Sequence, residues 1–233
     1  MKKSTKKLAN IRIFLLLCII SFLSHATIAS ADDQLPAVLD GILKRYSEIK
    51  GMSVPYKREI ITKSMAMLGD EVKSDAAAGK ILFMPPHYLA IRQITPGKET
   101  VTTDGQTIWY YVEAEKTVYE YPADALGREI RLLSEIFSGL SKVGDSFDVM
   151  QSDLEDRKDY HLELVPDPAW EDVDNIDLLV EKGSYYIRVV EIRDLLGGIT
   201  RFTLDELSVR KDLKKDDFSL KAPSGVKTIK EGQ

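Results

Sequence analysis

The chain is nearly devoid of cysteine: its 233 residues contain one, Cys18. That cysteine lies in an N-terminal segment with five positive charges and no negative charge before position 32. Residues 13–23 of this segment form an apolar run that contains a single serine. A basic start, a short apolar run and the triplet Ala29-Ser30-Ala31 are typical of a secretory signal peptide. We therefore expect residues 1–31 to be a cleaved signal peptide and residues 32–233 to form a single secreted mature domain.

The apolar run is too short for a membrane-spanning helix, which is the alternative interpretation. Its eleven residues would cover roughly 16 Å of a hydrocarbon core that is roughly 30 Å thick. Lipidation of Cys18 is also disfavoured, because Leu17 stands where a small residue is expected before a lipidated cysteine. Without Cys18, the mature chain has no disulfide, no thiol nucleophile and no thiolate metal site. A disulfide-free secreted domain must depend on its core, and about 200 residues are enough to build one.

Negative charges outnumber positive charges in the expected mature chain. The whole sequence has a net charge of −5, and the first 31 residues carry five positive charges, so the remaining 202 have a net charge of −10. A protein this acidic is a poor candidate for binding nucleic acid or anionic lipid headgroups through bulk electrostatics. We expect no nucleic-acid partner and a monomer.

Motifs of catalysis and metal binding are missing as well. The expected mature chain has two histidines, His87 and His161, without the paired spacing of a zinc site, and neither a nucleophile elbow nor a phosphate-binding loop occurs. An acidic stretch suggests a calcium loop, but counting from Asp172 the sixth and twelfth positions hold Asp177 and Gly183 instead of Gly and Glu. We therefore expect no metal, no cofactor and no enzymatic activity. A hydrolase built from scattered carboxylates is the alternative that remains.

Two segments have the apolar periodicity of amphipathic helices. In the first, from Leu35 to Ile49, Asp33 is a candidate cap and Gly51 a stop signal. In the second, from Ile130 to Leu140, the helix is expected to end near Gly139 or Gly144. These two segments are the predicted helices.

The remaining segments read as short strands separated by turn signals, of which Asp104-Gly105 is a strong hairpin signal. A long first strand is expected to begin at Val54 and to continue through Met65 and Met67. About eleven strands and two helices predict a mainly β, α+β fold: an antiparallel sheet that curls around helices lying across its mouth and leaves an apolar hollow. The later strands are predicted at residues 79–84, 88–94, 99–103, 107–112, 117–121, 147–151, 160–165, 175–181, 185–193 and 199–209.

Four segments together resemble a known family. Residues 79–86 read Gly-Lys-Ile-Leu-Phe-Met-Pro-Pro, similar to the family's Gly-x-hydrophobic-aromatic-x-x-x-Pro strand. Residues 103–111 read Thr-Asp-Gly-Gln-Thr-Ile-Trp-Tyr-Tyr and resemble its Ser-Asp-Gly-Lys-x-hydrophobic-Trp-x-Tyr hairpin. Residues 194–200 resemble its Asp-x-x-Gly-Asn-x-Thr turn, and residues 218–226 match its closing Phe-x-x-x-x-Pro-x-Gly-Val. In order and spacing, the chain resembles the periplasmic outer-membrane lipoprotein carrier family (LolA) over residues 34–229.

The resemblance implies a fold and an activity. The fold is an unclosed antiparallel β-barrel covered by helices that form a lid over an apolar cavity. The activity is to accept the acyl chains of lipoproteins from an inner-membrane ABC transporter and to deliver them to an outer-membrane receptor. Alternatives are a carrier of a different lipid and a regulatory, lipid-sensing binding module. Sensors of that second kind carry a further domain after the barrel, and the sequence ends at Gln233, which favours the carrier.

Strand parity and the two helix stripes supply candidate site residues. One departure from the family concerns the lid. The family has an arginine just before the proline of the strand that corresponds to residues 79–86, and that arginine holds the lid closed. This chain has Pro85 at that position. Proline cannot donate a hydrogen bond, and Arg58 and Arg92 are the candidate substitutes. The expected cavity residues are Tyr56, Ile60, Ile81, Phe83, Trp109, Tyr111, Phe202 and Leu204. The expected lid residues are Val38, Leu39, Ile42, Ile136, Phe137 and Leu140.

Overall fold

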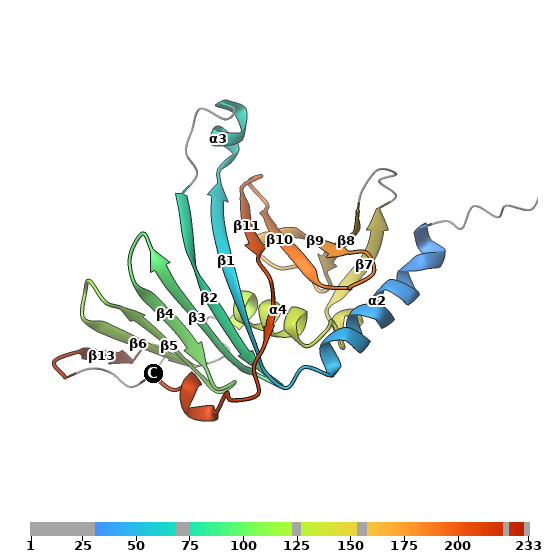
Figure 1. Cartoon of the computed structure of the whole chain (residues 1–233). Helices are drawn as coiled ribbons and strands as arrows, with labels where there is room; N and C mark the ends of the chain where they lie inside the picture. The colour runs from blue at the N-terminus through green and yellow to red at the C-terminus, as the bar shows by residue number, and fades with distance from the viewer. Residues whose placement is uncertain (1–30, 69–74, 123–126, 153–157, 221–223, 231–233) are drawn as a thin grey trace, which may run out of the picture.

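The protein is built around one large sheet (Figure 1). The computed structural model describes residues 31–68, 75–122, 127–152, 158–220 and 224–230. Within them, thirteen strands pair in the order β13-β6-β5-β4-β3-β2-β1-β11-β10-β9-β8-β7, and β12 pairs with the beginning of β1. Every neighbouring pair is antiparallel except β13 and β6, which are parallel. The strands are β1 (Met52–Ile61), β2 (Asp75–Met84), β3 (Tyr88–Thr95), β4 (Glu99–Thr103), β5 (Thr107–Val112), β6 (Thr117–Pro122), β7 (Phe147–Ser152), β8 (Asp159–Pro166), β9 (Val173–Glu181), β10 (Ile187–Asp194), β11 (Ile199–Leu204), β12 (Ser208–Val209) and β13 (Lys227–Lys230).

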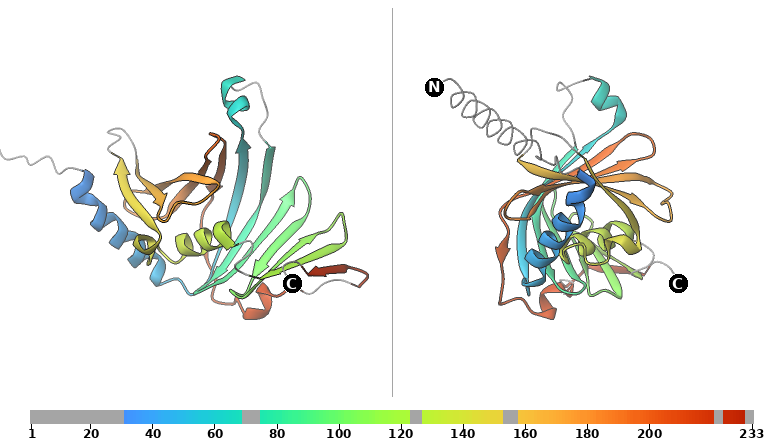
Figure 2. Two further views of the ribbon diagram at one scale, coloured as in Figure 1. Left: turned by 180° about the vertical axis from the view of Figure 1, so that it is seen from behind. Right: turned by 90° about the vertical axis from the view of Figure 1, so that its right-hand side faces the viewer.

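The sheet curls without closing. Its two terminal strands, β7 and β13, are not paired with each other in the described part of the chain. Figures 1 and 2 show the resulting trough, with α4 (Gly127–Phe137) inside the curve and α2 (Ala31–Ser47) along the side that ends in β7. Strands β4, β5, β6 and β13 extend away from α2 on the other side. The prediction of an unclosed antiparallel sheet covered by helices is therefore confirmed.

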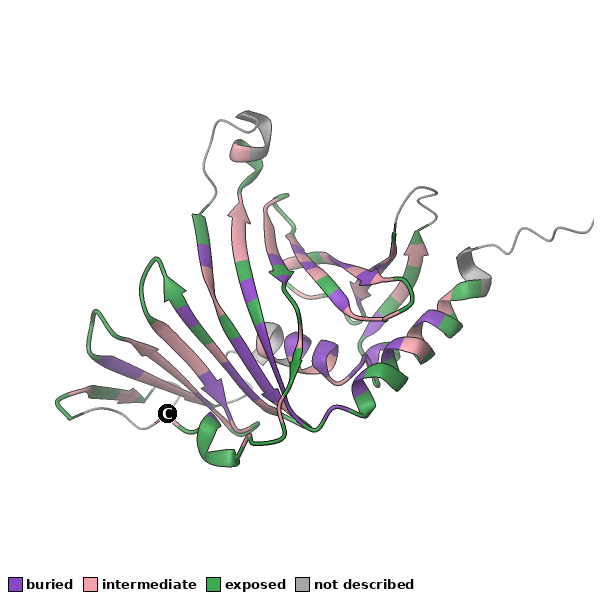
Figure 3. Cartoon of the chain, viewed as in Figure 1, coloured by how far each residue is buried: buried purple, intermediate pink, exposed green. Residues whose placement is uncertain are grey.

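The core lies between the concave face of the sheet and the two helices. The register places Met52, Val54 and Tyr56 of β1 beside Phe83, Ile81 and Gly79 of β2, so one face of both strands is apolar. Figure 3 shows the buried positions alternating along these strands and gathering toward α4 and the inner side of α2. This alternation is the pattern of a sheet with one covered and one solvated face.

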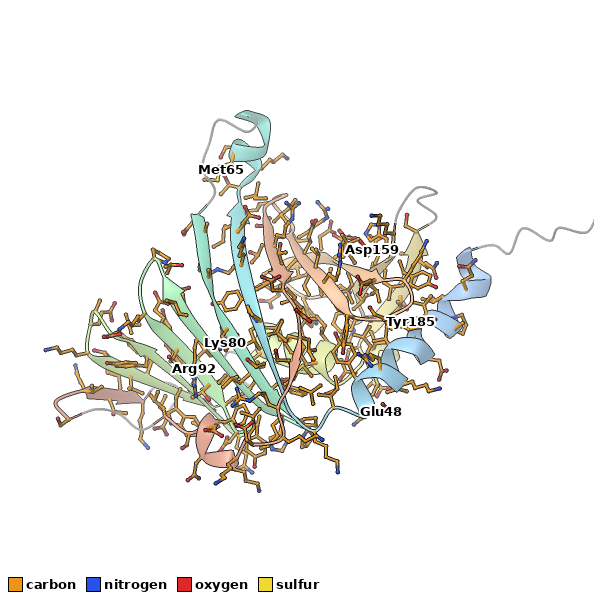
Figure 4. All side chains as sticks on the ribbon, viewed as in Figure 1. Glu48, Met65, Lys80, Arg92, Asp159 and Tyr185 are labelled. Atoms are coloured by element: carbon orange, nitrogen blue, oxygen red, sulfur yellow. The ribbon has the colours of Figure 1, made fainter. Side chains whose placement is uncertain are left out.

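Both helices have an apolar stripe at helical spacing. On α2, Val38, Ile42 and Tyr46 are buried while the positions between them are mostly exposed. Gly41 lies on this helix where a Cβ atom would clash with the Tyr185 ring, so glycine allows close contact; Figure 4 shows Tyr185 beside α2. On α4, Leu132, Leu133, Ile136 and Phe137 are buried. No helix in the described ranges has the length and apolarity needed to cross a membrane.

Charged side chains cover the opposite face of β8–β11. Arg201 Nε and Glu191 Oε1 are 2.8 Å apart, and Glu191 also binds Arg193, whose Nε lies 2.8 Å from Asp177 Oδ2. His161 Nε2 lies 3.0 Å from the second oxygen of Asp177. These side chains alternate with the apolar residues of the concave face, so they identify this face as the solvated one.

Two sequence predictions about the elements are wrong. The first strand does not continue through Met65 and Met67, because the chain turns after Ile61 into the short helix α3 (Lys63–Leu68), where the Thr62 hydroxyl accepts a hydrogen bond from Met65 N at 3.3 Å. A threonine side chain in this position caps a helix start. The predicted strand 199–209 is two strands, β11 and β12, and with β13 the sheet has thirteen strands instead of about eleven.

Candidate functional site: the covered concave face

Most predicted cavity and lid residues meet in one apolar cluster. The cluster joins the concave face to the buried sides of α2 and α4, and Leu39 packs against it as a partly buried side chain. The rings of Phe83 on β2 and Phe137 on α4 lie 5.8 Å apart, which makes a direct contact between a predicted cavity residue and a predicted lid residue. The predicted residues in the cluster are Tyr56, Ile81, Phe83, Phe202 and Leu204 from the sheet and Val38, Ile42, Ile136, Phe137 and Leu140 from the lid.

Ile60 lies farther along the same face. It is paired with Thr200 on β11 and Asp75 on β2, beyond Arg58, and it is partly buried. It therefore stands at the polar end of the concave face and outside the main apolar cluster.

Trp109 and Tyr111 lie on the other face of the sheet. They pair with Thr102 and Thr100 on β4, whereas Tyr110 pairs with Val101 and shares the concave face. The assignment of Trp109 and Tyr111 to the concave face is thus corrected by the strand register. Thr102 Oγ1 donates a hydrogen bond of 2.7 Å to Phe218 O, so the C-terminal segment packs on the outer face near these rings.

Three tyrosines lie on the concave side of this part of the sheet, where Trp109 and Tyr111 were expected. Tyr110, Tyr119 and Tyr121 form a row of stacked rings, with centroids 6.1 and 6.4 Å apart. Tyr110 donates a hydrogen bond of 2.7 Å to Glu99, and burial together with this bond raises the pKa of Tyr110 to about 12. The sequence shows aromatic residues at three successive positions of strand β5, but it does not indicate which of them faces inward.

A small pocket remains between α4 and the concave face, with a volume of about 120 Å³. We call it the Arg58 pocket. Ile130 and Leu133 of α4 cover it, and Tyr56, Arg58, Gln93 and Glu99 line it from the sheet. The Nε atom of Arg58 is buried there without a hydrogen-bond partner. Apart from this polar edge, the walls are apolar, so the pocket continues the concave face toward its charged end.

A larger hollow of about 430 Å³ lies at the C-terminal end of α2. Its lining includes the charged residues Arg45, Glu181, Arg188, Asp205 and Glu206. Tyr46 contributes its ring to the same hollow, and its hydroxyl accepts a hydrogen bond of 3.1 Å from Ile187 N. Burial raises the pKa of Tyr46 to about 12. Arg45 donates a hydrogen bond to the Tyr186 hydroxyl at the same end of the helix.

The two candidate substitutes for the family's latch differ in position. Pro85 is exposed in the turn between β2 and β3. Arg92 is labelled in Figure 4 on the sheet, and its Nη2 donates a hydrogen bond of 2.9 Å to Asp217 O in the C-terminal segment, away from the lid. Of the two, Arg58 alone lines the pocket beneath α4.

In the part of the chain that the structure describes, no three His, Cys, Asp or Glu side chains are grouped as metal ligands. The inner face consists of apolar and aromatic side chains together with Arg58, whose buried Nε atom has no hydrogen-bond partner in the described part of the chain.

An unclosed curved sheet whose apolar face is covered by two amphipathic helices is the architecture of a lipid-binding or lipoprotein-binding module. The family model described as outer membrane lipoprotein carrier protein LolA matches residues 67–221. The chain therefore belongs to the LolA family. No curated protein matches the sequence.

Solved structures include similar folds at low sequence identity. An uncharacterized conserved protein from Thermus thermophilus is 10% identical, with a TM-score of 0.54 over 84% of this chain and 99% of that one. A LolA superfamily protein from Nitrosomonas europaea is 11% identical, with a TM-score of 0.43 over 78% and 97%. A putative outer membrane lipoprotein-sorting protein domain from Vibrio parahaemolyticus is 12% identical, with a TM-score of 0.41 over 77% and 95%.

Proposed function

We propose that the protein is a periplasmic carrier that binds the acyl chains of lipoproteins and moves them from the inner to the outer membrane. In this proposal an inner-membrane ABC transporter loads it and an outer-membrane receptor unloads it. Residues 1–31 are the cleaved signal peptide, residues 32–233 form one carrier domain, and the protein performs no catalysis. Each buried methylene contributes about 0.8 kcal/mol, so acyl chains need a covered apolar surface to cross an aqueous compartment.

One observation carries the proposal: the lid helices cover the concave face through apolar side chains. The contact between Phe83 and Phe137 is an example, and Ile42 and Ile136 are fully buried in the same cluster. An acyl chain that replaced these side chains on the sheet would make contacts of the same chemical kind. The apolar contacts between the lid helices and the sheet can therefore be replaced by contacts with an acyl chain at a small net change in free energy.

The size of the pocket indicates that binding needs lid movement. The Arg58 pocket has a volume of about 120 Å³, whereas small-molecule sites typically have roughly 300–1,000 Å³. The larger hollow beside α2 has five charged residues among the twelve that line it, so it suits hydrocarbon less well than the apolar face beneath the lid. We therefore place the cargo between the sheet and a displaced lid, in contact with Tyr56, Ile81, Phe83, Phe202 and Leu204.

The test is to purify the mature protein from the periplasm and to identify what is bound to it. Organic extraction followed by mass spectrometry should release acylated molecules, and the emptied protein should bind a fluorescent acyl probe that triacylated lipopeptide displaces. A protein that co-purifies with no lipid and binds no probe would contradict the proposal. Release of a lipid that is not a lipoprotein would reassign the cargo, and capture of a membrane-bound regulator instead of a lipoprotein would favour the sensing module.

A further inference from the structure

Arg58 is a charged residue placed among apolar ones. It lies on β1 opposite Phe202 of β11 and Ala77 of β2, two positions after Tyr56 on the same face. Its Nε atom is buried and has no hydrogen-bond partner in the part of the chain that the structure describes. A buried donor without a partner destabilises the closed protein. Such a group needs a functional explanation, because the structure supplies no stabilising one.

Two other polar residues of the Arg58 pocket are already engaged. Glu99 accepts the hydrogen bond of the Tyr110 hydroxyl, and Gln93 Nε2 donates a bond of 3.0 Å to Gly97 O. Among the residues that line this pocket, Arg58 alone has a buried polar side-chain atom without a hydrogen-bond partner in the described part of the chain. Ile130 and Leu133 of α4 cover the pocket, so a ligand that reaches Arg58 lies against apolar side chains along the rest of its length.

The charges of the pocket indicate which kind of acceptor fits. Arg58 and Glu99 together give the pocket a net charge of zero. Both charges act on the same ring, since the Arg58 charge lowers the pKa of Tyr110 and the Glu99 charge raises it. A carboxylate or phosphate bound at Arg58 would be repelled by Glu99 in this partly buried site. A neutral carbonyl oxygen accepts the Arg58 hydrogen bond without that repulsion.

We propose that Arg58 donates a hydrogen bond to the ester or amide carbonyl at the polar end of a bound acyl chain, while the hydrocarbon lies on the apolar face under α4. This inference deepens the proposed function and rests on it. Arg58 thereby selects acyl esters and amides over free fatty acids, which carry a carboxylate at the same place.

The experiment measures displacement of a fluorescent acyl probe by three molecules of equal chain length: methyl decanoate, decanoate and decane. We expect the wild-type protein to bind methyl decanoate more tightly than the other two. In Arg58→Met the advantage of the ester over decane should fall about tenfold, the size expected for one hydrogen bond to a charged donor. The melting temperature of Arg58→Met should equal or exceed that of the wild type, because the substitution removes an unpaired buried donor.

Two further variants separate the Arg58 interaction from a general effect of charge. Lys57→Met removes the neighbouring exposed charge on the opposite face of β1, and its ester affinity should equal that of the wild type. Glu99→Gln keeps an acceptor for Tyr110 and removes the negative charge, so decanoate should bind more tightly than it does to the wild type.

The outcomes distinguish this inference from the proposed function. If decane and methyl decanoate displace the probe equally, before and after the Arg58→Met substitution, the carbonyl inference is overturned while acyl binding stands. Tighter binding of decanoate than of its ester to the wild type would also overturn it, by showing a carboxylate site. If the wild type binds no probe at all, the carrier proposal itself fails.

Discussion

At the scale of single residues, Tyr46 links the lid to the sheet. Its ring belongs to the apolar cluster, and its hydroxyl accepts a hydrogen bond from Ile187 N at the start of β10. Burial raises the pKa of Tyr46 from its ordinary value of 10.0 to about 12. The native state therefore holds this proton more tightly than the unfolded chain does, and the associated stability is present below pH 10.

From this shift we predict a loss of stability in alkali. As pH rises from 10 to 12, the unfolded chain releases the Tyr46 proton first, so the free energy of unfolding falls, by about 2 kcal/mol over this range. Tyr46→Phe should be about 1 kcal/mol less stable than the wild type at pH 8, because Ile187 N loses its partner, and should lose less stability between pH 10 and 12. Urea unfolding at pH 10 and at pH 12 measures the free energy of unfolding of both proteins. Tyr111→Phe on the outer face is the control; equal pH dependence of Tyr46→Phe and the wild type would contradict the prediction.

Residues also show how far the sequence alone could predict the site. Tyr56 could be placed because the charged residues Lys57 and Glu59 fall on the other parity of its strand and fix which face is apolar. Strand β5 offers no such contrast, since apolar or aromatic residues occupy its successive positions 108–112. The direction in which its side chains face is set by its register with β4, which places Tyr110 inside and Trp109 outside. The buried Nε atom of Arg58 is likewise visible only once its neighbours are placed.

At the scale of elements, the two lid helices meet at a glycine. Gly139 follows α4 with φ of 79°, and a Cβ atom there would lie 3.0 Å from Tyr46 Cβ and 3.1 Å from Leu43 Cα on α2. The sequence predicted the helix to end near Gly139 or Gly144, and the structure selects the first. Positive φ and the close approach both require glycine here.

We predict that Gly139→Ala lowers the free energy of unfolding by about 1–3 kcal/mol, through strain in the left-handed backbone and displacement of α2. Gly144→Ala is the matched control, because a Cβ atom at Gly144 would meet nothing within 4 Å. Its stability should change by less than about 0.5 kcal/mol. Chemical denaturation of both variants measures the difference. Equal stability of the two variants would show that the contact between α2 and α4 does not depend on this turn.

Elements were predictable where one local pattern was unambiguous. The stripe on α2 repeats over four turns, and each hairpin from β2 to β5 is marked by glycine or proline. The helix α3 was missed because the apolar residues around Met65 also fit a continuing strand. The hydrogen bond from Met65 N to the Thr62 hydroxyl stabilises the start of the helix. The pairing of β13 with β6 could not be predicted from local pattern either, because the two strands lie more than a hundred residues apart in the sequence.

At the scale of the whole molecule, the lid and the sheet are held by different kinds of interaction. Strand β9 has backbone partners on both sides, β8 and β10. Helix α2 is joined to the sheet mainly by apolar side chains, with hydrogen bonds at its C-terminal end from Ile187 N to Tyr46 and from Arg45 to Tyr186. Apolar contacts can open locally at a free energy below that of global unfolding, whereas a central strand cannot leave without the sheet.

This difference predicts how a carrier should respond to cargo. In hydrogen exchange measured by mass spectrometry, the backbone amides of α2 should exchange faster than those of β9 in the empty protein. An acyl ligand at a hundred times its dissociation constant stabilises the bound form by about 2.7 kcal/mol, which corresponds to exchange about a hundredfold slower wherever opening releases the ligand. The slowing should extend over α2 and α4 and leave β13 unchanged, because β13 lies at the far edge of the sheet. If α2 and β9 exchange at one rate, with and without ligand, the lid opens only when the whole protein unfolds. Cargo could then not enter by displacing the helices, and the site would have to lie outside the covered face.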